Sequence, residues 1–103
     1  MSSTRSRSDT APRSFTIRND TGFTARNVFV RKAGETGWGE NILSQPLYNG
    51  RSIFVRLGES FDASSLYSIR MVDIDGDVYA KYNIRIQEQS RIRIIIDDLE
   101  YDR

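Results

Sequence analysis

The chain is predicted to be all-β, a compact antiparallel β-sandwich or small barrel of about six or seven strands. Three observations predict this class. Apolar and polar residues alternate with a period of two over most of the chain, helical periodicity is nearly absent, and turn-forming residues separate the alternating runs. A chain of 103 residues supports a single hydrophobic core, so one domain is expected.

The predicted domain covers residues 14–98. Residues 1–13 have no hydrophobic pattern and are predicted to form a disordered tail, and residues 99–103 form an acidic C-terminal end. Six alternating runs are predicted as strands; in chain order they are residues 15–19, 27–31, 52–57, 66–73, 77–87 and 91–97.

Turn residues bound these runs. Asn19–Gly22 ends the first strand, and Asn49–Gly50 precedes the third. Between the second and third strands, residues 39–43 are predicted to form one short helical turn, which would need tertiary support. The strongest prediction is the pair of long runs on either side of Asp73–Asp77, which reads as a hairpin.

The Asp75–Gly76 pair predicts a two-residue turn for this hairpin, because a type I′ turn needs positive φ at both positions. The resulting register sets Ile69 against Tyr82 and gives one apolar face. A three-residue loop would set Ile69 against Lys81 instead. Since a slip of one residue moves side chains to the other face, burial favours the two-residue turn.

Three residues are candidates for contact with a ligand or partner. The two-residue register places Arg70 opposite Lys81, where like charges cost about 0.2–1 kcal/mol unless an acidic group lies between them. A neighbouring Asp or Glu would supply that group, and the alternative is a bound anion or a partner's acidic residue. Trp38 could stack on a sugar or a partner, although a lone tryptophan also commonly completes a core.

Asp73, Asp75 and Asp77 form a cluster of carboxylates around Gly76. Oxygen ligands that converge at a bend are those that calcium prefers. The spacing does not match an EF-hand loop, so a calcium site would need ligands from other loops. Candidates for these are Glu59, Asp62 and Asp20. Two interpretations stay open: a weak calcium site, or a solvated tip whose aspartates serve turn geometry.

Composition excludes several classes of function. The chain has no cysteine and no histidine, which removes disulfides, thiolate or imidazole metal sites and histidine-based catalysis. No glycine pattern indicates a phosphate loop, so an enzyme is not expected. The net charge of +1 gives no electrostatic footprint for nucleic acid. No apolar run approaches the ~20 residues of a transmembrane helix, and the N-terminus lacks the apolar segment of a signal peptide.

Four segments carry a resemblance to a known group of proteins: residues 19–22, 38–43, 49–50 and 67–79. The most specific combination is the Trp-Gly segment at Trp38 with the Val-Asp-x-Asp-Gly-Asp-x-Tyr hairpin that starts at Val72. Over residues 14–98 the chain resembles small bacterial β-sandwich modules of envelope or exported proteins. That group has no established activity. The resemblance therefore implies the fold and an exported location, in the periplasm or cell envelope.

These observations favour a non-enzymatic binding or interaction module. Its ligand would be calcium, a glycan or another envelope protein, and calcium is the one cofactor that the pattern indicates. The alternative is a purely structural or assembly module without a dedicated ligand, which would associate through an exposed strand edge.

Overall fold

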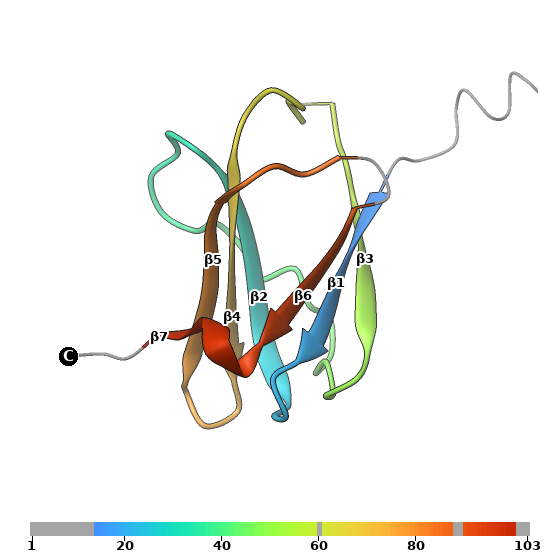
Figure 1. Ribbon diagram of the computed structural model, residues 1–103, viewed down its shortest axis with the longest axis vertical. Coiled ribbons are helices and arrows are strands. Elements are labelled where there is room, and N and C mark those ends of the chain that lie inside the picture. Colours follow the sequence, from blue (N-terminus) through green and yellow to red (C-terminus); the bar gives the residue numbers. More distant parts are fainter. Residues whose placement is uncertain (1–13, 60, 88–89, 101–103) are drawn as a thin grey trace, which may run out of the picture.

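The computed structural model describes residues 14–59, 61–87 and 90–100, so the predicted disordered tail and the last three residues lie outside the described part. Within it the chain is all-β, as predicted, with seven strands and one short 3-10 turn (Figure 1). The elements are β1 (Ser14–Asp20), β2 (Ala25–Lys32), β3 (Ser52–Arg56), β4 (Tyr67–Asp73), β5 (Val78–Ile84), β6 (Arg91–Ile95), the 3-10 turn η1 (Ile96–Asp98) and β7 (Leu99–Glu100).

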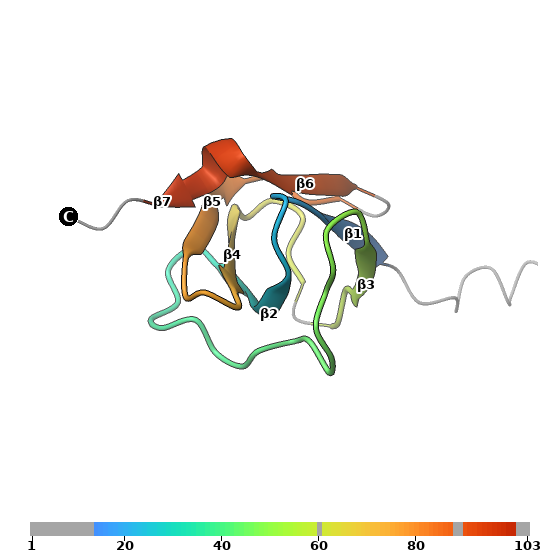
Figure 2. The ribbon, with the colours of Figure 1, turned by 90° about the horizontal axis from the view of Figure 1, so that it is seen from below.

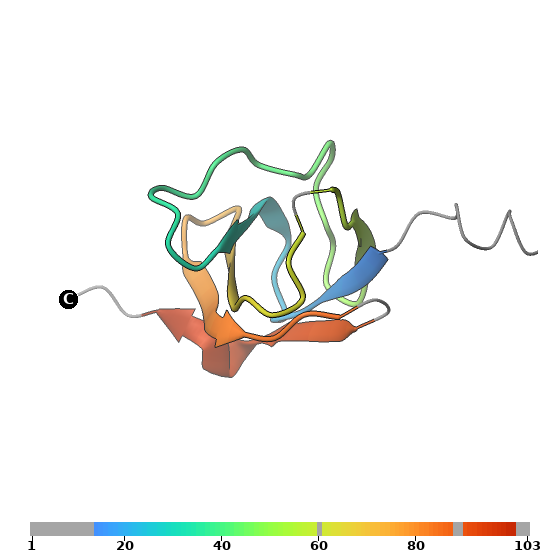
Figure 3. The ribbon, with the colours of Figure 1, turned by 90° about the horizontal axis from the view of Figure 1, so that it is seen from above.

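The strands form two sheets that face each other. One has three strands in the order β3-β1-β6, and the other has four in the order β2-β4-β5-β7. The segment that joins β2 to β3 runs outside β2 before it returns to the three-stranded sheet (Figures 2 and 3). Strand β7 pairs with β5, so the four-stranded sheet continues beyond residue 98, where the predicted domain ends.

One pair of strands departs from the predicted antiparallel arrangement. β1 runs antiparallel to β3 but parallel to β6. Parallel neighbours cannot be joined by a tight hairpin. Here β6 follows β5, which belongs to the opposite sheet, so the chain crosses between the sheets and enters beside β1 in the same direction.

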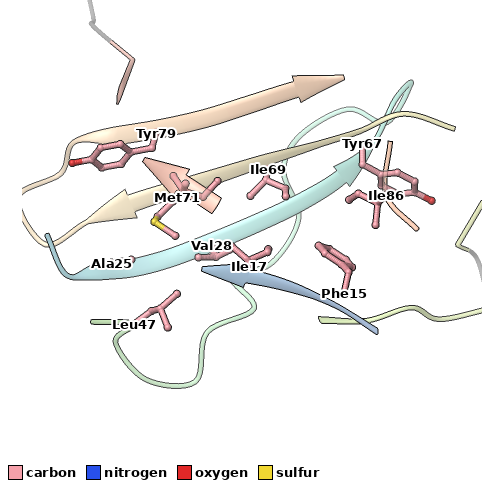
Figure 4. Close-up of a cluster of buried hydrophobic side chains, with 11 residues drawn as sticks. Phe15, Ile17, Ala25, Val28, Leu47, Tyr67, Ile69, Met71, Tyr79 and Ile86 are labelled. Atoms are coloured by element: carbon pink, nitrogen blue, oxygen red, sulfur yellow. The ribbon is translucent and has the colours of Figure 1, made fainter. Parts of the chain in front are cut away.

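The hydrophobic core fills the space between the sheets and takes side chains from both. Ile17 of β1 and Ile94 of β6 come from the three-stranded sheet, and Val28, Ile69 and Met71 come from the four-stranded sheet; all are fully buried. Figure 4 shows Ile17 directed at Val28 and Ile69 across this space. Burying each such side chain stabilises the fold by roughly 1.5–3 kcal/mol.

The central hairpin has the three-residue register, so the predicted two-residue turn is wrong. Ile69 pairs with Lys81 rather than with Tyr82, and Met71 pairs with Tyr79. Gly76 has a φ of 89° and donates its N–H to the carbonyl of Asp73. The Asp-Gly pair thus supplies the left-handed glycine of a longer loop instead of a type I′ turn.

A β-bulge explains why the apolar pattern was misleading. The register shifts between Tyr67 and Ile69, and Tyr67 faces Ile84 as predicted. The extra residue lies on β5, where Asn83 has a φ of 56°, a conformation that asparagine tolerates better than most residues. Before the bulge, Tyr79 faces the core; after it, Ile86 does. The segment that begins with β5 therefore buries odd-numbered positions before the bulge and even-numbered positions after it.

The short helical turn is at Ile96–Asp98, not at residues 39–43, which form no helix. Residues 41–47 instead run along the outer edge of β2 and cover it. The Val28 carbonyl accepts a hydrogen bond from the Ile42 N–H, and Ala25 and Leu47 exchange two backbone hydrogen bonds. Covering an edge strand satisfies its backbone groups, and that requirement outweighs a weak local helical tendency. Among the described residues, no helix combines the length and the hydropathy needed to cross a membrane.

Candidate functional site

The first candidate is the acidic tip of the β4–β5 hairpin. Asp73 is 1% exposed, and its carboxylate is fully engaged inside the protein. Oδ1 accepts hydrogen bonds from the N–H groups of Asp75 and Asp77, both at 2.9 Å, and Oδ2 accepts one from the Tyr79 hydroxyl at 2.9 Å. Burial, and then this hydrogen bond, raise the pKa of Tyr79. Asp73 therefore anchors the loop from within.

Asp75 and Asp77 are exposed at the same tip, so the hairpin presents two exposed carboxylates rather than three. In proteins, calcium is bound by about six to eight oxygen ligands, which come from carboxylates, carbonyls and water. Over the described ranges, no group of three or more acidic side chains is placed to hold a metal ion.

Two of the other three carboxylates suggested as calcium ligands have local partners. Asp20 accepts hydrogen bonds from Arg93 at 2.8 Å and Arg18 at 2.9 Å, and these lower its pKa. Asp62 holds its own loop by accepting hydrogen bonds from Ser64 and Ser65, which lower its pKa. Glu59 lies exposed in the same loop. The hydrogen bonds of Asp20 support strand pairing, and those of Asp62 support loop geometry.

The observed register separates two of the predicted interaction residues. Lys81 shares a face with Ile69 and forms a salt bridge of 3.1 Å with Asp98 of η1. Arg70 pairs with Ala80 and lies on the opposite, outer face of the four-stranded sheet. The two positive charges are therefore not cross-strand neighbours, and Lys81 has the nearby acidic partner that the sequence indicated.

Arg70 meets Trp38 on that outer face, together with two residues that the sequence did not single out. The Arg31 guanidinium lies 4.2 Å from the centre of the Trp38 ring, and that of Arg70 lies 6.0 Å from it. The rings of Tyr82 and Trp38 are 6.3 Å apart at a tilt of 54°. We call Arg31, Trp38, Arg70 and Tyr82 the basic-aromatic patch.

Strand pairing brings this patch together. Arg31 of β2 is opposite Ser68 of β4, and the bulge brings Tyr82 of β5 beside the same position. Trp38 comes from the segment that follows β2, and its ring lies against Arg31 and Tyr82. Its contact with Arg31 is a cation–π interaction, worth about 0.5–1 kcal/mol at an exposed site. One residue from each of three strands and one from a loop thus converge on a single surface.

The polar groups of the patch differ in whether they have a partner among the described residues. Among the described residues, neither Arg31 nor Arg70 forms a salt bridge, and the buried Nε of Arg70 has no hydrogen-bond partner. Tyr82 donates its hydroxyl to Glu100 at 2.6 Å, and this hydrogen bond raises the pKa of Tyr82. Glu100 therefore holds Tyr82 at the edge of the patch.

Arg31 and Tyr82 were missed because their position depends on the register. The two-residue turn assigns Tyr82 to the core face, whereas the observed turn and bulge place it outside, 48% exposed. The three-residue loop that the sequence also permits would have indicated this placement. Arg31 carried a weaker signal: it lies two residues after Phe29 on β2 and therefore shares a face of the sheet with it.

No family model, curated protein or solved structure matches the chain. The structure supports a small two-sheet β fold. The likeness to envelope β-sandwich modules and the exported location that it implies stay predictions from the sequence.

Proposed function

We propose that the protein is a non-enzymatic binding module and that the basic-aromatic patch binds a carboxylate-bearing ligand. The observation that carries this proposal is the placement of two guanidinium groups beside one indole ring, without an acidic partner in the described part of the chain. Guanidinium groups bind carboxylates through paired N–H donors. Trp38 and Tyr82 add flat apolar surface beside those donors.

The ligand chemistry is a carboxylate next to an apolar surface. An acidic sugar of an envelope glycan has this chemistry, and so does an aspartate or glutamate side chain of an envelope protein. The calcium hypothesis has less support, because Asp73 is used internally and the tip retains two exposed carboxylates.

The fluorescence of Trp38 tests the proposal, because it is the only tryptophan of the chain. The full chain would be titrated with D-glucuronate, with acetate as a carboxylate that lacks a ring, and with D-glucose as a ring that lacks a carboxylate. We expect a saturable change with glucuronate, with a Kd on the order of 1 mM, and none with glucose. Equal binding of acetate would indicate a protein side chain, and much tighter binding of glucuronate would indicate an acidic glycan.

Matched variants locate the binding. Arg70→Gln and Arg31→Gln are each expected to weaken glucuronate binding about tenfold, because each removes a charged donor pair. Arg91→Gln makes the same charge change at the start of β6, in the other sheet, and should leave binding unchanged. A response to glucose equal to that for glucuronate, or no response to either carboxylate, would contradict the proposal.

A further inference from the structure

β2 and β3 each lie at the edge of a sheet, and the two edges differ in whether another segment covers them. β2 ends the four-stranded sheet, and residues 41–47 cover its edge. β3 ends the three-stranded sheet, and no described strand pairs with its outer edge. An uncovered edge offers backbone donors and acceptors to another extended chain. This surface is separate from the basic-aromatic patch.

The pairing of β3 with β1 shows which backbone groups are free. Asn19 donates its N–H to the carbonyl of Arg51 at 2.9 Å, which places Arg51 in a hydrogen-bonded pair. In an antiparallel ladder such pairs recur at every second residue. Ile53 and Val55 therefore bond to β1. The N–H and C=O groups of the intervening residues, Ser52, Phe54 and Arg56, point toward the free edge.

A groove of about 860 Å³ runs beside this edge, between β3 and residues 42–48. Its lining includes the partly buried Leu43 and Ile53. Large apolar side chains stand exposed around it: Phe54 is 80% exposed, Tyr48 60% and Ile42 42%. An added strand would therefore gain apolar contacts as well as backbone hydrogen bonds.

The charge of the groove indicates which kind of chain would bind in it. Arg51 and Arg56 line it. Among the described residues, no acidic side chain lines it and neither arginine forms a salt bridge. We propose that the β3 edge binds an extended peptide of alternating apolar and acidic residues, which adds a strand to the three-stranded sheet. Its apolar side chains would face the space between β3 and residues 42–48, and its acidic side chains would lie beside Arg56.

A second copy of the chain fits this edge less well. Antiparallel pairing of two β3 strands centred on Phe54 would match the free backbone groups of both. It would also bring the Arg51 and Arg56 side chains of both copies together, and like charges at an interface oppose association. The first thirteen residues of the chain are equally unsuitable by charge, because they carry three arginines and one aspartate.

The test uses a short fluorescein-labelled peptide of alternating valine and glutamate, and its binding to the full chain is measured by anisotropy. A peptide of alternating valine and lysine is the charge control. Phe54→Pro removes a backbone donor that points away from β1, so the fold should persist, as proline is accepted on strand edges. We expect Phe54→Pro to abolish binding of the glutamate peptide.

The double variant Arg51→Glu/Arg56→Glu provides a second route that does not depend on a backbone change. It should weaken the glutamate peptide about tenfold or more and improve binding of the lysine peptide. Equal binding of both peptides by the unaltered chain, or binding of the glutamate peptide that survives both variants, would overturn the proposal. So would concentration-dependent dimerisation in sedimentation that Phe54→Pro removes and the peptide does not compete with.

Discussion

At the scale of single residues, the carboxylate of Asp73 shows how a buried charge can organise a loop. Its two oxygens accept three hydrogen bonds, two from backbone N–H groups of the tip and one from Tyr79. These bonds close the three-residue loop, and the loop sets the register of β4 against β5. The position of Tyr82 on the outer face therefore depends on a side chain on the inner face.

Replacing Asp73 with alanine should lower the free energy of unfolding by about 3 kcal/mol, because it leaves the buried Tyr79 hydroxyl and two backbone donors without acceptors. Asp75→Ala is the matched control at the exposed tip and should change the free energy of unfolding by less than about 0.5 kcal/mol. Urea denaturation measures both. Equal effects of the two substitutions would show that Asp73 is not an internal anchor.

Asp20 gives the fold a pH dependence of defined sign. In the parallel register Arg18 and Arg93 are neighbours, and Asp20 contacts both. The hydrogen bond from Arg93, followed by that from Arg18, lowers the pKa of Asp20 below its ordinary value of 3.8. The unfolded chain therefore binds a proton at higher pH than the folded protein does. The contribution of Asp20 to stability is present above the unfolded pKa and is lost as the pH falls through the folded pKa.

Asp20→Asn should accordingly flatten the loss of stability below pH of about 4, measured by urea denaturation at a series of pH values. The double variant Arg18→Gln/Arg93→Gln removes the cause of the shift and should flatten the same part of the curve. Parallel curves for the original chain and Asp20→Asn would contradict this role.

At the scale of elements, strand positions were predictable and strand register was not. Alternation located all six long strands, because a half-buried strand shows its two faces directly in the sequence. Asp75–Gly76, however, is compatible with loops of two and three residues. The apolar pattern could not decide between them, since the bulge at Asn83 reverses which positions of β5 face the core. A bulge is visible only once two strands are paired.

The segment after β2 shows a second limit of local reasoning. Residues 39–43 have a weak helical tendency, yet the edge of β2 requires hydrogen-bond partners. Asn41 meets that requirement with its side chain: its Oδ1 accepts the N–H of Val28 at 2.8 Å. The same segment leads from Trp38, which belongs to the patch, to Leu47, which lies in the core. Long-range contacts of this kind cannot be read from spacing alone.

At the scale of the whole molecule, two sheets enclose one core and present two distinct surfaces. The outer face of the four-stranded sheet carries the basic-aromatic patch, and the uncovered edge of the three-stranded sheet carries the groove beside β3. Of the predicted candidates, Trp38 and Arg70 meet, Lys81 lies on the other face, and the three aspartates divide into one anchor and two exposed groups. The paired sheets explain this division, because they assign each side chain to a face.

Proton NMR detects the side-chain contacts of the basic-aromatic patch in solution. We predict nuclear Overhauser contacts between the Trp38 indole and the Tyr82 ring, whose centres are 6.3 Å apart, together with backbone contacts between Met71 and Tyr79. Contacts between Tyr82 and Ile69, with none between Tyr82 and Trp38, would show the two-residue register and would remove the proposed binding surface.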